Sequence, residues 1–201
     1  VDELQYDMIY HEHVYHYSLL SAINHFARYG MMVFDVMRIP IHAGSLRFYV
    51  CRKGSKHATE SPRVVALREE ERARGLDSFE TFREFSNQVA AQRDELVAVL
   101  ERLRKEGRAI AGYGASGRAN TMIQFCGLDD RHLDYMIDDA PAKQGFLTPG
   151  SHFPIHPSSV LEESDPPDYV LVFAWSFFDE ICGRNAKYLE NGGRMILPLP
   201  D

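Results

Sequence analysis

Histidine, glutamate and tyrosine side chains that can move a proton are concentrated near the start of the sequence. Residues 10–13 read Tyr-His-Glu-His, and residues 15–17 read Tyr-His-Tyr. Histidine titrates near neutral pH, an adjacent carboxylate can orient its ring and keep it basic, and a tyrosine hydroxyl can donate to a developing oxyanion. Together these residue types are suited to general acid–base chemistry.

The position of this cluster leaves other interpretations open. Residues 6–10 have the pattern of a strand, which would place the cluster just past a carboxyl strand end, where ligands bind in open α/β sheets. On a strand, His11 and His13 would share one face and could hold a metal ion, but no third ligand stands at a diagnostic spacing, so we expect no metal site. The cluster could equally be a polar strand end without chemistry.

A glycine-rich segment lies between a predicted strand and a predicted helix. Residues 112–117 read Gly-Tyr-Gly-Ala-Ser-Gly. Glycines permit a tight turn, and the following helix start attracts phosphate. Asp138, about twenty residues further along, stands where the ribose-binding acid of a dinucleotide site would be. The motif alone indicates NAD, and a turn that serves only strand–helix packing is the alternative.

Two features argue against NAD. The strand–helix region, residues 108–201, is roughly half of a full dinucleotide-binding fold. The helix start also carries Arg118, Asn120 and Thr121, which suit a diphosphate of another kind.

Two further residues are predicted at the same sheet edge. Lys143, in a polar loop at residues 142–152, could pair with a phosphate. Trp175 ends a predicted strand and could either stack on a base or sugar or belong to the core.

The elements that position these residues fall into three zones. The first zone contains a helix with Ser18 as its N-cap and Gly30 just past its end, followed by a hairpin that turns around Pro40, Ala43 and Gly44. The second zone is helical, and its long helix carries an apolar stripe at Val89, Leu96, Leu100 and Leu103. The third zone alternates strands with helices. The predicted strands are residues 6–10, 31–39, 45–51, 108–114, 133–138, 169–175 and 194–199, and the predicted helices are residues 18–29, 62–74, 78–107, 118–126 and 179–191, with a helical turn at 160–163.

The third zone predicts an α/β fold. Strands separated by crossovers form a parallel sheet with right-handed connections. The continuous apolar run at residues 170–173 fits a strand that is buried on both faces. We therefore expect a Rossmann-like parallel sheet domain, preceded by a long helix and a strand–helix–hairpin fragment.

Composition excludes several classes of protein. The net charge of −7 and the absence of a basic stripe argue against nucleic-acid binding. No apolar run approaches the roughly 18 residues of a membrane span, and no secretory signal pattern is present. The cysteines, Cys51, Cys126 and Cys182, are widely spaced and odd in number, so we expect neither a disulfide framework nor a metal-binding pair, and a cytoplasmic location.

Four separated segments, in order, resemble the S-adenosylmethionine-dependent sugar C-methyltransferases, which act on thymidine-diphosphate-linked ketosugars in antibiotic deoxysugar pathways. The matching segments are Tyr-His-Glu-His at 10–13, Ile-His-Ala-Gly at 41–44 with Leu-Arg-Phe-Tyr-Val at 46–50, the glycine loop at 112–121, and Lys-Gln-Gly at 143–145 with Thr-Pro-Gly at 148–150 and Ala-Trp at 174–175. The sequence departs from the family in the glycine loop, where Ser116-Gly117 replaces Pro-Ala and Arg118-Ala119 replaces Lys-Gly.

The resemblance implies a domain order. Residues 1–53 would be the end of the methyltransferase catalytic domain, residues 54–107 a helical linker, and residues 108–201 the C-terminal Rossmann-like domain. The family carries a zinc-binding region and a glycine-rich S-adenosylmethionine loop further upstream, and neither matches a segment of this sequence. We therefore expect a C-terminal portion that binds the nucleotide sugar and is inactive by itself.

The resemblance also implies a mechanism. A base removes the proton on the carbon next to the 4-keto group, and the enolate attacks the methyl group of S-adenosylmethionine. His13 would be the base, with Glu12 orienting it and Tyr10 assisting at the oxyanion, and His11 is the less favoured alternative base. The candidates for holding the nucleotide sugar are Gly114, Ser116, Arg118, Asn120, Thr121, Lys143 and Trp175.

Two other functions stay open at this point. An NAD-dependent oxidoreductase would use the glycine motif with Asp138. A non-catalytic nucleotide-binding or partner-docking module would use the same fold without chemistry.

Overall fold

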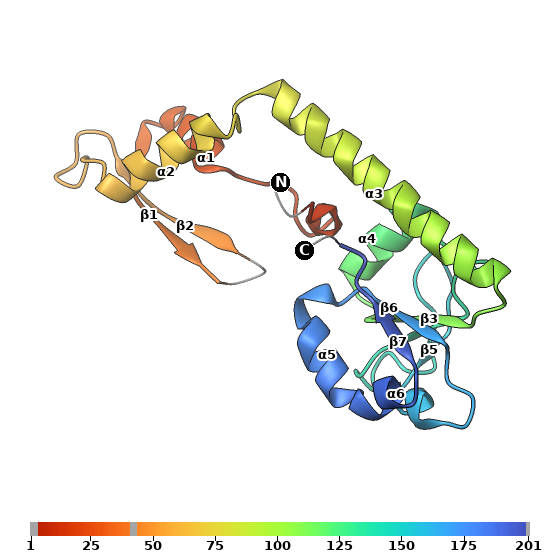
Figure 1. Ribbon diagram of the computed structural model, residues 1–201. Helices are drawn as coiled ribbons and strands as arrows, with labels where there is room; N and C mark the ends of the chain where they lie inside the picture. The colour runs from red at the N-terminus through yellow and green to blue at the C-terminus, as the bar shows by residue number, and fades with distance from the viewer. Residues whose placement is uncertain (1–3, 41–43, 200–201) are drawn as a thin grey trace. The chain divides into compact units, whose positions relative to one another are not determined.

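The computed structural model describes residues 4–40 and 44–199, whose elements are drawn in Figure 1. The contacts divide the chain into two compact units. We call residues 1–13 together with 87–201 the sheet unit, and residues 14–86 the hairpin unit.

The hairpin unit contains two helices that pack on a two-stranded antiparallel sheet. Its elements are α1 (Leu19–Ala27), β1 (Met31–Ile39), β2 (Ser45–Arg52) and α2 (Pro62–Ala73). The predicted helices and strands of this part are confirmed to within two residues at each end, and Ser18 caps α1 as predicted. Of the predicted turn, Ala43 lies outside the described residues, as do the first three residues of the family segment 41–44.

A buried carboxylate joins the two helices of the hairpin unit. The two oxygens of Glu71 accept the backbone N–H groups of Leu19 and Leu20, each at 2.8 Å. These first-turn N–H groups have no acceptor within α1, and a negative charge is favourable at a helix start. Glu71 on α2 therefore stabilises the beginning of α1.

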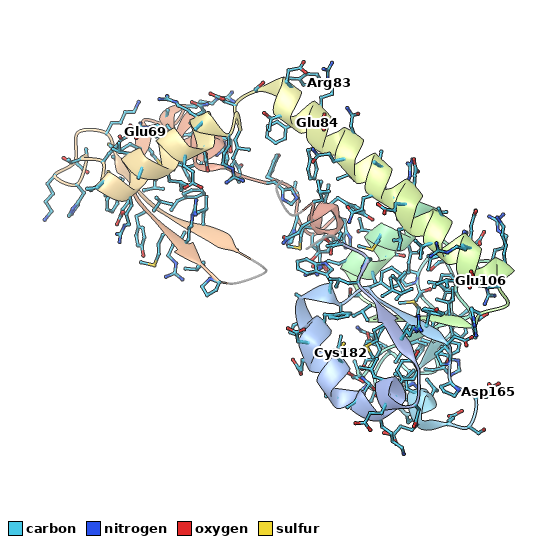
Figure 2. The ribbon with its side chains drawn as sticks, viewed as in Figure 1. Glu69, Arg83, Glu84, Glu106, Asp165 and Cys182 are labelled. Atoms are coloured by element: carbon cyan, nitrogen blue, oxygen red, sulfur yellow. The ribbon has the colours of Figure 1, made fainter. Side chains whose placement is uncertain are left out.

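Helix α3 (Phe79–Lys105) begins in the hairpin unit and ends in the sheet unit. Its 27 residues correspond to about 40 Å at 1.5 Å per residue. The predicted apolar stripe is confirmed, because Val89, Leu96, Leu100 and Leu103 are buried. Figure 2 shows the charged side chains of Arg83 and Glu84 near the start of α3, and both are exposed.

The sheet unit is built on five parallel strands in the order β5-β4-β3-β6-β7. The strands are β3 (Ile110–Tyr113), β4 (Tyr135–Ile137), β5 (Ile155–His156), β6 (Tyr169–Val172) and β7 (Arg194–Ile196). The helices are α4 (Gly117–Cys126), α5 (Phe178–Arg184) and α6 (Ala186–Glu190), with short 3-10 turns η1 (Tyr6–Met8), η2 (Ser158–Glu162) and η3 (Trp175–Phe177). The predicted Rossmann-like parallel sheet is confirmed.

The chain crosses from one side of the sheet to the other between β3 and β6. The chain first adds β4 and β5 on one side of β3, then returns to add β6 and β7 on the other side. This reversal is the topological switch point, outside which open α/β sheets bind their ligands at the carboxyl strand ends. The strands beside it are deeply buried, since Val170, Leu171 and Val172 have no exposed surface.

Several sequence-based boundaries were wrong. Residues 6–10 form no strand, and the first three of them form the 3-10 turn η1. Tyr6 and Asp7 are both buried, whereas adjacent residues of a strand point to opposite faces. The strand predicted to reach Trp175 ends at Val172, and Trp175 begins η3. The helix predicted over residues 179–191 is divided at Asn185 into α5 and α6. The two-residue strand β5 was not predicted.

Within the described ranges, no helix combines the length and the apolar character that crossing a bilayer requires.

Candidate active site

The site lies where β3 and β6 end, at the switch point of the sheet. Gly114 follows β3 with a φ of +96°, a conformation that side chains other than glycine rarely adopt. A Cβ atom at Gly114 would lie 2.8 Å from the Cβ of Ala174, two residues past β6. The two strand ends therefore approach each other closely only because residue 114 is glycine.

The other glycines of the motif also have packing reasons. A Cβ atom at Gly112 would lie 2.3 Å from the sulfur of Met136. A Cβ atom at Gly117 would lie 3.3 Å from the ring of Tyr10, so this ring covers the start of α4. The motif is explained by contacts within the chain and does not by itself indicate a dinucleotide.

The first turn of α4 carries the predicted polar groups. Ser116 is the N-cap, and its hydroxyl accepts the backbone N–H of Ala119 at 3.2 Å. Thr121 donates its hydroxyl to the carbonyl of Gly117 at 3.2 Å. The side-chain oxygen of Asn120 is buried and has no hydrogen-bond partner among the described residues. The exposed Ser116 and the positive helix end form the open side of this turn.

Asp7 joins the start of the chain to both sides of the switch point. One oxygen, Oδ2, accepts from Arg118 Nε at 2.9 Å and from Trp175 Nε1 at 2.8 Å. The Arg118 guanidinium also lies over the Trp175 ring, 4.8 Å from its centre. Asp7 is 1% exposed, so this is a buried ion pair. Asp7 was not among the predicted site residues, although a lone acid in the run Tyr-Asp-Met-Ile is a signal of a buried partner.

His13 is held by a backbone carbonyl. Its Nδ1 lies 2.9 Å from the carbonyl oxygen of Met8. A carbonyl can only accept, so Nδ1 carries the proton and the ring's lone pair is on Nε2. The Tyr10 ring lies 4.7 Å from the His13 ring, centre to centre, and the Tyr10 hydroxyl donates to Glu12 at 3.2 Å. Met8 thus takes the position at Nδ1 that the sequence assigned to Glu12.

The polar side chains of the loop after β4 bind to one another within the loop. Lys143 pairs with Asp138 at 2.8 Å, and Ala140 donates its backbone N–H to the same carboxylate at 2.9 Å. Gln144 donates to the backbone carbonyl of Asp138 at 3.0 Å. The acid that the glycine motif would assign to a ribose is therefore bonded within its own loop, and Lys143 is placed beside it.

Among residues 4–40 and 44–199, no three His, Cys, Asp or Glu side chains form a set that could hold a metal ion. All three cysteines are unpaired thiols.

Residues 40–200 match the family described as the C-methyltransferase C-terminal domain. This chain belongs to that family. It is also similar to the C-methyltransferase NovU of Streptomyces niveus, with 33% identity over 197 residues. The alignment covers 98% of this chain and 46% of NovU, so the chain spans less than half the length of this relative.

In this C-methyltransferase domain, the structure brings most of the predicted site residues to one edge of the sheet unit. Tyr10, Gly114, Arg118 and Trp175 gather at the switch point through the contacts described above. Lys143 lies on the loop after β4, where it pairs with Asp138.

A second polar cluster, which the sequence did not predict, lies at this edge. Tyr113, the last residue of β3, donates its hydroxyl to Asp139 at 2.8 Å, and Arg184 pairs with the same oxygen at 3.0 Å. Burial, and then the hydrogen bond to Asp139, raise the pKa of Tyr113 to about 12. Tyr113 therefore stays protonated at neutral pH and cross-links β3 to the loop after β4.

Proposed function

We propose that this C-methyltransferase domain binds a nucleotide-diphosphate-linked 4-ketosugar and carries the base that removes the proton next to the keto group. One observation carries the proposal: His13, with its proton on Nδ1, belongs to a segment anchored at the switch point of the sheet. That place is where open α/β sheets bind their ligands. Membership in the C-methyltransferase family supports it.

The chemistry assigned to His13 follows from its tautomer. The lone pair on Nε2 takes the proton from the carbon next to the ketone, and the imidazolium that forms keeps its hydrogen bond to the Met8 carbonyl. This carbonyl also keeps the ring oriented in both protonation states. His11, whose side chain is exposed, is the alternative base.

Tyr10 is the donor for the oxygen of the developing enolate. Desolvation, followed by the hydrogen bond to Glu12, raises the pKa of Tyr10 above its usual value, so the hydroxyl keeps its proton. Its ring lies close both to Gly117 at the start of α4 and to the His13 ring. Glu12 acts through Tyr10 by accepting its hydroxyl in the absence of substrate.

The diphosphate of the substrate is assigned to the start of α4. The exposed N-cap Ser116, the backbone after Gly114, and Arg118 with Asn120 and Thr121 offer hydrogen-bond donors and positive potential there. Lys143 and Trp175 complete the proposed site. Because the Arg118 guanidinium occupies one face of the Trp175 ring, a base or sugar would have to stack on the other face.

S-adenosylmethionine, when bound to the whole enzyme, would supply the methyl group that the enolate attacks, and we assign none of the described residues to it.

Hydrogen exchange tests the base directly. The whole methyltransferase that contains this chain is incubated in heavy water with a thymidine-diphosphate 4-ketosugar and without a methyl donor. We expect deuterium to enter the carbon next to the ketone, and we expect His13→Gln to abolish this exchange. His11→Gln is the matched control and should retain it. Exchange at the wild-type rate by His13→Gln would show that His13 is not the base.

A further inference from the structure

We propose that Asp7 is a positioning residue that holds Arg118 for the substrate diphosphate and holds the His13 segment at the same end of the sheet. This inference rests on the proposed function. It names the residue that couples the proposed diphosphate site to the proposed base.

The contacts of Asp7 restrain Arg118 at two places. Its Oδ2 binds Nε of Arg118, and the Trp175 ring covers one face of the guanidinium. Trp175 is held in turn, because its indole N–H donates to the same oxygen. An arginine that is fixed by Nε and by one face has lost most of its rotational freedom before any ligand arrives, which lowers the entropic cost of binding.

The outer edge of the guanidinium remains for a ligand. Over the part of the chain that the structure describes, the two terminal nitrogens of Arg118 make no hydrogen bond. These two nitrogens form the fork that binds phosphate oxygens in a bidentate manner. Asp7 thus uses the inner edge of Arg118 and leaves the phosphate-binding edge available.

The same carboxylate also anchors the proposed base. Asp7 precedes Met8, whose carbonyl holds the Nδ1 of His13. On its other side, Tyr6 is buried, with its hydroxyl 3.4 Å from the sulfur of Cys126 and its ring 4.9 Å from the Phe125 ring. Tyr6 holds η1 against α4 by packing. Asp7 orients η1 toward the switch point.

A purely structural role explains this arrangement less well. Replacing a buried ion pair by apolar residues of similar volume is often neutral or even stabilising. The second oxygen of Asp7 is buried without a hydrogen-bond partner among the described residues, which is a further cost. What the ion pair does provide is a defined direction for the charged edge of Arg118.

The first test uses this chain, in which Trp175 is the sole tryptophan. Asp7→Asn keeps the size of the side chain but removes the charge that holds Arg118. We expect a shift in Trp175 emission in the unliganded chain and about tenfold or more weaker binding of thymidine diphosphate. Asp134→Asn is the matched control, since Asp134 pairs with Arg104 at 2.9 Å before β4, at the amino end of the sheet. Its emission and affinity should match the wild type.

A double variant tests whether Asp7 acts through Arg118. We expect Asp7→Asn/Arg118→Gln to bind thymidine diphosphate no more weakly than Arg118→Gln alone, because residues that act as one unit give non-additive effects. Additive losses would overturn the inference. Arg118→Lys keeps a charge opposite Asp7 but loses the Nε donor and the fork, so it should lose affinity even if Asp7→Asn fails to fold.

The whole enzyme provides a readout that a general loss of stability would not give. We expect Asp7→Asn to raise KM for the nucleotide sugar and also to lower kcat, because both the diphosphate and His13 depend on it. If the wild-type chain binds no thymidine diphosphate, the proposed function and this inference both fail. If the wild type binds and Asp7→Asn binds equally well with unchanged emission, the inference alone fails.

Discussion

The Nδ1 atom of His13 lies 2.9 Å from the carbonyl oxygen of Met8, five residues earlier in the chain. This relationship decides the tautomer of the ring, because the carbonyl can only accept a hydrogen bond. It also ties the proposed base to η1, which is buried against α4 through Tyr6. The chemistry assigned to His13 therefore depends on a backbone group that no side-chain pattern reveals.

We predict that His13→Gln lowers methyl transfer by the whole enzyme by at least about a hundredfold, the usual range for loss of a general base. Binding of the nucleotide sugar should change little, because we assign the diphosphate to the start of α4. Methyl transfer from labelled S-adenosylmethionine and nucleotide-sugar affinity are the two measurements. His11→Gln is the control. If His11→Gln loses methyl transfer while His13→Gln retains it, then His11 and not His13 is the base.

A stability cycle probes the buried ion pair. Arg118→Gln leaves the Asp7 carboxylate buried without its charged partner, and we expect it to cost about 3 kcal/mol in the free energy of unfolding. Adding Asp7→Asn removes the uncompensated charge and should restore roughly 1 kcal/mol or more. Chemical denaturation of the wild type, the two single variants and the double variant measures both changes in the free energy of unfolding. A double variant less stable than Arg118→Gln would contradict the buried pair.

Much of the fold could be predicted because periodicity is a local property of the sequence. The apolar stripe of α3 and the run at residues 170–173 identified a buried helix face and a buried strand, and both are present. Errors arose where tertiary contacts decided the local structure. Residues 6–10 have strand-like composition, yet the partners of Tyr6 and Asp7 are more than a hundred residues away, so a single turn replaces the strand.

The site was predictable in its residue types but not in its pairings. Arg118, Lys143 and Trp175 were candidates for a ligand because each stands at the predicted carboxyl edge of the sheet, and for Trp175 a core position was the alternative. Their pairing with Asp7 and Asp138 followed from no spacing rule, because ion pairs depend on which loops meet in space. The spacing from the glycine motif singled out Asp138, but for a ribose and not for Lys143. The glycine motif was the weakest signal, since packing against Met136, Ala174 and Tyr10 accounts for it.

Gly114 offers a test of the close approach between β3 and β6. We expect Gly114→Ala to cost on the order of 2 kcal/mol, because it combines a left-handed φ with a contact of 2.8 Å to Ala174. Gly107→Ala is the matched control: its φ is +75°, but no atom lies within 4 Å of the added methyl group. Equal losses in thermal unfolding for the two variants would show that strand packing is not the reason for glycine at residue 114.

The Tyr113–Asp139 pair predicts a loss of stability at high pH. An unfolded tyrosine has a pKa of about 10, whereas that of Tyr113 is raised to about 12 in the folded chain. Its contribution to stability is therefore present below pH 10 and is lost as the pH rises toward 12. Subtracting the tyrosinate absorbance of Tyr113→Phe from that of the wild type, at each pH, isolates the ionisation of Tyr113. Asp139→Asn should lower the pKa of Tyr113, and ionisation of Tyr113 near pH 10 in the wild type would contradict the described burial.

The central claim is that this C-methyltransferase domain holds a nucleotide diphosphate at the switch point of its sheet. Titrating the chain with thymidine diphosphate and, separately, with NAD⁺, while following the fluorescence of Trp175, tests it most directly. We predict a saturable change with thymidine diphosphate and none with NAD⁺. Saturable binding of NAD⁺ alone would contradict the claim and favour a dinucleotide-binding oxidoreductase.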